Sequence, residues 1–124
     1  NSFVRELPSN ESEIDLAIKI SLNFAKELAM LLKKENIKLT VVVYPWPGNL
    51  LHDSLQSKYV KIWKNFCELN CDNFLNTYPK FFEIQKGQIR DFYLKNDVHF
   101  NSKGTKLIAE EITEKIILDK ITIQ

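Results

Sequence analysis

The run Leu39-Thr40-Val41-Val42-Val43 constrains the fold more than any other part of this sequence. It is short, rich in β-branched side chains and apolar on both alternating faces, which is typical of a central parallel strand buried on both sides. Helical patterns with apolar residues at three- and four-residue steps flank it, from about Ser9 to Lys34 and from Ser57 to Leu69. A buried strand between amphipathic helices predicts an α/β fold with a parallel sheet.

The rest of the sequence supports the same architecture. Ser9 or Asn10 can cap the first helix, and Asn36 is a helix stop. We expect the first helix to cover one face of the sheet, and Trp63 and Phe66 to be core anchors. The later chain predicts a second strand, a short helical turn and a final helix capped by Ser102, at residues 72–77, 78–83 and from 102 onward.

Composition excludes several classes of protein. The chain has 124 residues with 44% hydrophobic and 27% charged residues, as in ordinary globular domains. Its net charge is only +1, with lysines and acids interspersed, so nothing indicates binding to nucleic acid or to an anionic membrane. No apolar run is long enough to span a bilayer, and the first residues lack a signal-peptide pattern. These features favour a soluble, cytoplasmic protein. They do not decide the compartment of a longer protein of which this chain is a part.

The two cysteines, Cys67 and Cys71, lie four residues apart in a helical pattern. This spacing suggests either a metal site or a disulfide. A metal needs further ligands, and a disulfide within one helix is geometrically awkward. We expect ordinary reduced thiols that are partly packed.

The strongest functional lead is Asp97-Val98-His99, which precedes the final helix. A carboxylate that accepts a hydrogen bond from one imidazole nitrogen fixes the tautomer, so that the other nitrogen can take a proton from a nucleophile. Asp97 and His99 have the chemistry for these two roles. They are the predicted catalytic residues.

A second candidate site follows the strand, at Tyr44-Pro45-Trp46-Pro47. Each proline restricts its own φ and the residue before it, which makes the loop rigid. Open α/β sheets bind ligands at the carboxyl ends of their strands, so Tyr44 and Trp46 are candidate walls of a substrate pocket. Plain loop packing is the alternative for both aromatic residues.

The other histidine, His52, has Asp53 and Ser54 beside it. Adjacent residues point apart and cannot converge as a catalytic triad, so we expect a solvated loop there. A metal site that combines Asp97, His99 and His52 or a cysteine is a further alternative, but no third ligand stands at a recognisable spacing. No metal and no cofactor is therefore predicted.

The block from Asn96 to Gly104 resembles the last motif of the SGNH (GDSL-type) hydrolases, whose Asp and His complete a serine triad. The Thr40–Pro47 segment is also similar to a segment in one bacterial subgroup of that family. The commonest family form places the Asp three residues before the His, where this chain has Asn96. The Asp-x-His spacing is similar to a variant in some branches, and it leaves open which residue orients the histidine.

The resemblance implies a three-layer α/β/α fold of the flavodoxin-like type, with residues 1–124 as the C-terminal part of one SGNH-like domain. It also implies an esterase or lipase that acts on small-molecule or carbohydrate esters, including O-acyl groups. The family's Gly-Asp-Ser nucleophile block is absent, because the three glycines precede Asn49, Gln88 and Thr105. We therefore expect the chain alone to be inactive.

Two further expectations follow from the missing nucleophile and from the small number of strands. The rival reading is a non-catalytic α/β domain that binds a ligand or oligomerises. A part of a sheet would also leave a strand edge and an apolar face uncovered, which favours a homo-oligomer.

Overall fold

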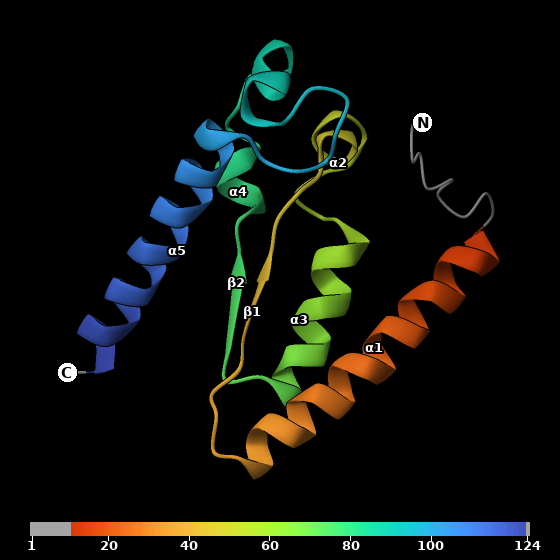
Figure 1. Ribbon diagram of the computed structural model, residues 1–124, viewed down its shortest axis with the longest axis vertical. Coiled ribbons are helices and arrows are strands. Elements are labelled where there is room, and N and C mark those ends of the chain that lie inside the picture. The colour runs from red at the N-terminus through yellow and green to blue at the C-terminus, as the bar shows by residue number, and fades with distance from the viewer. Residues whose placement is uncertain (1–10, 124) are drawn as a thin grey trace. The chain divides into compact units, whose positions relative to one another are not determined.

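The structure is a computed structural model that describes residues 11–123, with side chains for 13–118. It is mixed α/β and divides into two compact units at the boundary between Leu39 and Thr40 (Figure 1). The elements, in chain order, are α1 (Glu11–Lys34), β1 (Thr40–Val43), α2 (Pro47–His52), α3 (Lys58–Asn70), β2 (Asn73–Asn76), α4 (Tyr78–Phe81), the 3₁₀ helix η1 (Lys86–Phe92) and α5 (Ser102–Ile123).

The first unit consists of the long helix α1 and its C-terminal turn. Asn36 adopts a left-handed φ of 55°. The amide of Ile37 donates to the carbonyl of Leu32 (2.9 Å) and that of Asn36 to the carbonyl of Lys33 (3.1 Å), which is the Schellman pattern. The predicted stop at Asn36 is therefore confirmed, whereas the predicted cap at Ser9 or Asn10 lies outside the described residues. Phe24, Leu28 and Leu31 of the predicted apolar stripe are exposed.

The second unit contains a sheet of two parallel strands. β1 pairs with β2 in a register that runs from Thr40 opposite Asn73 to Val43 opposite Asn76, which confirms both predicted strands. Thr77 extends this pairing, since its amide and its hydroxyl both donate to the carbonyl of Val43 (3.1 and 2.8 Å). Helix α3 packs against both strands, as predicted (Figure 1).

The prediction that β1 is fully buried was wrong. Val41, Val42 and Val43 are only half-buried. In the described part of the chain, β1 has one neighbouring strand instead of two. The described residues thus form a mixed α/β structure, mostly helical, with a two-stranded parallel sheet.

The main core lies beyond the carboxyl ends of the strands. The α2 residue Leu50 packs there with Phe81, Ile89 and Tyr93, and partly buried side chains of α5 such as Leu107 close the cluster. Helix α5 packs mainly against η1, and it reaches β2 through Lys115, whose Nζ donates to the carbonyl of Asn76 (2.5 Å). The predicted anchors Trp63 and Phe66 are half-buried and pack edge to face, outside this cluster.

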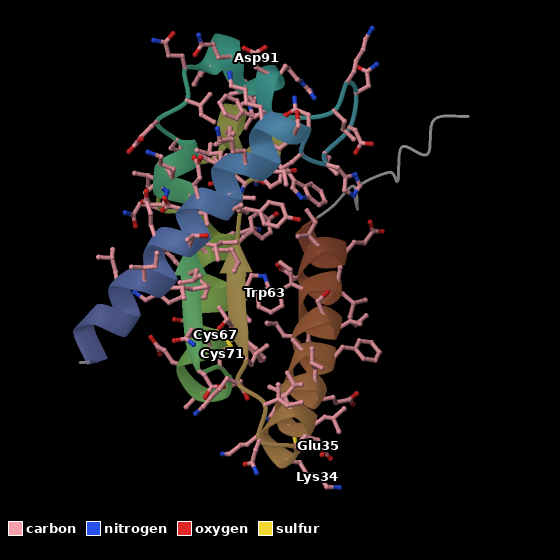
Figure 2. All side chains as sticks on the ribbon, turned by 60° about the vertical axis from the view of Figure 1, so that its left-hand side comes forward. Lys34, Glu35, Trp63, Cys67, Cys71 and Asp91 are labelled. Carbon is pink, nitrogen blue, oxygen red and sulfur yellow. A yellow bond between two sulfur atoms is a disulfide. The ribbon has the colours of Figure 1, made fainter. Side chains whose placement is uncertain are left out.

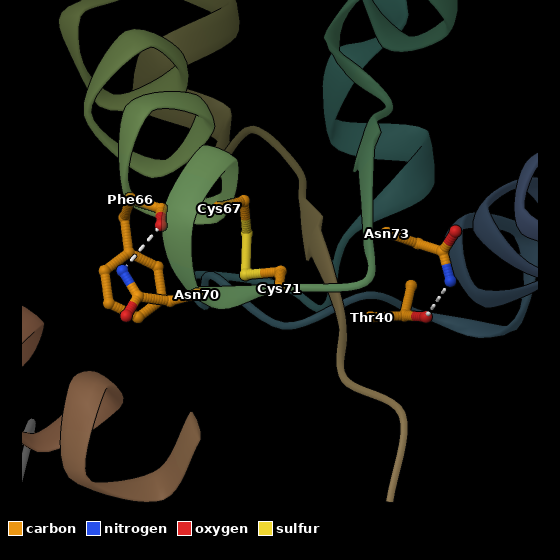
Figure 3. Close-up of a disulfide and its surroundings, with 6 residues drawn as sticks. All are labelled: Thr40, Phe66, Cys67, Asn70, Cys71 and Asn73. Atoms are coloured by element: carbon orange, nitrogen blue, oxygen red, sulfur yellow. Dashed lines mark hydrogen bonds between the residues drawn. A yellow bond between two sulfur atoms is a disulfide. The ribbon is translucent and has the colours of Figure 1, made fainter. Parts of the chain in front are cut away.

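The cysteines are oxidised, contrary to the prediction of free thiols. Cys67 and Cys71 form a disulfide, with their Cα atoms 4.5 Å apart (Figures 2 and 3). Cys71 is the C-cap residue of α3 and has extended backbone angles (φ −117°, ψ 158°). A disulfide is awkward when both cysteines lie inside one helix. Here Cys71 has already left the helix, and the Cα separation is within the usual range for disulfides.

Candidate functional site

The predicted catalytic residues lie in a closed loop between η1 and α5. Tyr93 and Phe100 form an antiparallel bridge at its base, and the amide of Leu94 donates to the carbonyl of His99 (2.9 Å). Asn96 turns the chain with a φ of 57°, a left-handed conformation that asparagine tolerates better than most residues. The six residues 94–99 are referred to below as the histidine loop.

Asp97 is the residue that orients His99. Its Oδ1 lies 2.6 Å from Nδ1 of His99 and also accepts the backbone amides of Val98 (2.6 Å) and His99 (3.1 Å). These hydrogen bonds, the backbone bond from His99 first, lower the pKa of the Asp97 carboxyl below its ordinary value. Asn96, three residues before His99, forms the turn instead. Asp97, and not Asn96, therefore orients the histidine ring.

The protonation of this pair follows from the same geometry. An ionised carboxylate can only accept hydrogen bonds, so Nδ1 of a neutral His99 ring carries the proton and Nε2 carries the lone pair. The side chain of His99 is 76% exposed and that of Asp97 is 42% exposed. His99 therefore has one ring nitrogen hydrogen-bonded to a carboxylate and a side chain that solvent can reach.

Asn101 anchors the histidine loop to the start of α5. Its side-chain amide donates to the carbonyls of Asp91 (2.7 Å) and Tyr93 (3.3 Å), and its Oδ1 accepts the amide of Gly104 (3.0 Å). Asn101 therefore caps α5, and the predicted cap at Ser102 was wrong because Ser102 is already the first helical residue. An asparagine directly before the helical pattern is a signal that could have identified it.

Gly104 permits the close approach of α5 to the base of the loop. A Cβ atom at this position would overlap the carbonyl oxygen of Phe92 and would lie 2.7 Å from Cδ1 of Phe100. Only glycine fits there without a shift of the backbone.

The Tyr44–Trp46 loop contacts Tyr93 and Phe100, the two residues at the base of the histidine loop. The rings of Tyr44 and Phe100 are 5.2 Å apart, and Phe100 directly follows His99. The hydroxyl of Tyr93 donates to the carbonyl of Pro45 (2.6 Å). Tyr44 and Trp46 are 44% and 43% exposed, so both present aromatic surface. Tyr44 thus contacts the residue that follows His99, and Trp46 lies two residues after Tyr44 in the same loop.

Residues 52–57 have structural roles. His52 is exposed and ends α2, so this part of the predicted solvated loop is helical. Asp53 accepts the hydroxyl of Ser57 (2.6 Å), and Ser57, 1% exposed, accepts the amide of Tyr59 (3.3 Å) as the N-cap of α3. These hydrogen bonds hold the turn between α2 and α3.

The described residues contain neither a cluster of metal ligands nor a helix suited to a membrane. No three His, Cys, Asp or Glu side chains in this part of the chain lie close enough together to hold a metal ion. Of the helices described, none combines the length and the apolar content that a bilayer crossing requires.

Comparison with known proteins does not identify a relative: no protein-family model, curated protein or solved structure matches the chain. A functional assignment therefore depends on the residues and their geometry.

Proposed function

We propose that this chain supplies the acid and the base of an SGNH-type serine esterase, and that its fold is the C-terminal part of the corresponding three-layer α/β/α domain. The observation that carries the proposal is the 2.6 Å contact between Oδ1 of Asp97 and Nδ1 of an exposed His99. A parallel sheet with aromatic residues in the loop at its carboxyl end supports it.

In the proposed reaction, Nε2 of His99 takes the proton of a serine hydroxyl as the serine oxygen attacks an ester carbonyl. Asp97 stabilises the imidazolium that forms. The bond between the acyl carbon and the alkoxide oxygen then breaks, His99 protonates the departing alkoxide to an alcohol, and the acyl group remains on the serine. A water molecule, deprotonated by His99 in turn, releases the acid and restores the serine.

The serine must come from a segment outside this sequence, because the chain contains no Gly-Asp-Ser block. Ser57, which pairs with a carboxylate, is buried and committed to the start of α3. Tyr44 and Trp46 would form a wall for the acyl group or for a sugar ring that carries it, so carbohydrate O-acyl esters are the proposed substrate class.

The missing nucleophile also favours one alternative, a non-catalytic domain that binds a ligand or associates with itself. One measurement distinguishes the esterase from the non-catalytic domain. It is the hydrolysis of acetyl esters by a form of the protein that includes a Gly-Asp-Ser segment.

That form should hydrolyse p-nitrophenyl acetate, whereas the 124-residue chain should not. His99→Ala should lower kcat by roughly 10⁴-fold or more, because the serine loses its base. His52→Ala is the matched control, since it removes the other histidine, and should leave the rate unchanged. An inert protein, or a rate that survives His99→Ala, would refute the esterase proposal.

A further inference from the structure

Tyr93 is a buried residue at the base of the histidine loop. It is 3% exposed, its backbone pairs with Phe100, and its ring lies 5.1 Å from the ring of Phe100. Tyr93 is therefore fixed on the same framework that carries Asp97 and His99.

The hydroxyl of Tyr93 reaches a loop that is distant in the sequence. It donates to the carbonyl of Pro45, 48 positions away, in a buried hydrogen bond of 2.6 Å. Pro45 lies between the two exposed aromatic residues Tyr44 and Trp46 and is itself almost fully buried. Burial raises the pKa of the Tyr93 hydroxyl far above its ordinary value, so this group stays protonated and remains a donor.

The loop that Tyr93 holds also has hydrogen bonds to helix α2. The amide of Trp46 donates to Oδ1 of Asn49 (2.9 Å), and the carbonyl of Trp46 accepts the amide of Leu50 (3.2 Å). Both bonds fix Trp46 relative to α2. The bond from Tyr93 to Pro45 instead fixes the loop relative to the histidine loop.

We propose that the Tyr93 hydroxyl is a positioning group, which sets the place of the Tyr44–Trp46 wall relative to His99. The inference rests on the proposed esterase function for its substrate, an acyl ester that contacts both loops. The Asp97–His99 hydrogen bond joins two residues of the same short loop and does not involve Tyr93. Loss of the hydroxyl should therefore affect substrate binding more than proton transfer.

The test uses Tyr93→Phe, which removes the hydroxyl and keeps the ring. In a Trp63→Phe background Trp46 is the single tryptophan, because the chain has two. Acrylamide should then quench the fluorescence of Trp46 more strongly in Tyr93→Phe than in its parent. In the form with a Gly-Asp-Ser segment, KM for p-nitrophenyl acetate should rise roughly tenfold, as expected for one lost buried hydrogen bond, with kcat and its pH profile nearly unchanged.

Tyr78→Phe is the matched control. Tyr78 is also 3% exposed, and its hydroxyl lies near Ser57 instead of near the aromatic loop. The variant Tyr78→Phe should destabilise the second unit about as much as Tyr93→Phe does, and it should leave the quenching of Trp46 unchanged.

The inference is wrong if Tyr93→Phe leaves the quenching unchanged, or if Tyr78→Phe raises it equally. An active enzyme whose KM does not respond to Tyr93→Phe also refutes the positioning role. If the protein proves inert, the esterase proposal fails, and the quenching experiment alone decides whether Tyr93 holds the wall.

Discussion

At the scale of single residues, the candidate site is built by a very local set of contacts. Oδ1 of Asp97 takes part in three hydrogen bonds, all with groups of the next two residues along the chain, Val98 and His99. Such contacts depend on a few backbone angles, so a sequence motif can predict them. The Tyr93–Pro45 bond joins residues 48 positions apart, and no local pattern indicates it.

The Asp97 carboxyl should titrate below its ordinary pKa of 3.8. Because the folded-state pKa is lowered, the carboxylate stabilises the histidine loop above the unfolded value, and this contribution is lost as the pH falls through the folded one. We expect the loop to stay closed down to about pH 4 and to open only below it. Carbon-13 NMR of the Asp97 carboxyl and the amide shifts of Val98 and His99 would follow both events.

The variant His99→Ala separates the causes of this shift. The backbone amide of residue 99 is the largest of them, and it survives the substitution. The pKa of Asp97 should therefore remain lowered, with part of the shift lost along with the ring. A return to the ordinary pKa in His99→Ala would show that the ring, not the loop backbone, holds the carboxylate.

At the scale of elements, the sequence predicted those whose pattern is long or strongly β-branched. β1, α3 and α5 are in this class, and their periodicity alone identifies them. α2 was missed because a helix of six residues is too short to show a helical period, although Pro47 at its first helical position is a start signal. The disulfide was missed because its formation depends on where α3 ends, and the end of a helix is less constrained by pattern than its middle.

Gly104→Ala tests how α5 joins the histidine loop. Alanine would favour the helix by up to about 1 kcal/mol, but its Cβ meets a backbone carbonyl that cannot move independently. We expect a net loss of about 1–3 kcal/mol in the free energy of unfolding, as for other overpacked sites. Urea denaturation followed by circular dichroism measures this value.

The control for this experiment is Gly48→Ala. Gly48 lies in α2, and a Cβ there would have no neighbour within 4 Å. This variant should be neutral or slightly stabilising. Equal losses from both substitutions would mean that the close packing around Gly104 is not the cause.

At the scale of the whole molecule, the described residues leave apolar surface uncovered. A sheet of two strands is marginal on its own, and β1 has one described neighbour. In the first unit, α1 exposes large apolar side chains at four-residue steps, at Leu16, Ile20, Phe24 and Leu28. A continuous apolar ridge of this kind usually marks a surface that another chain or segment covers.

We therefore expect the isolated chain to self-associate through α1. Multi-angle light scattering should give a mass above the 14.5 kDa of one chain, increasing with concentration. Phe24→Glu places a charge in the middle of the ridge and should restore the monomer mass while helicity is retained. Leu69→Glu is the control, because Leu69 is a single apolar residue on α3 with 90% exposure, and it should leave the association unchanged. A monodisperse monomer at all concentrations would refute the prediction, and dissociation by Leu69→Glu as well would place the interface elsewhere than on α1.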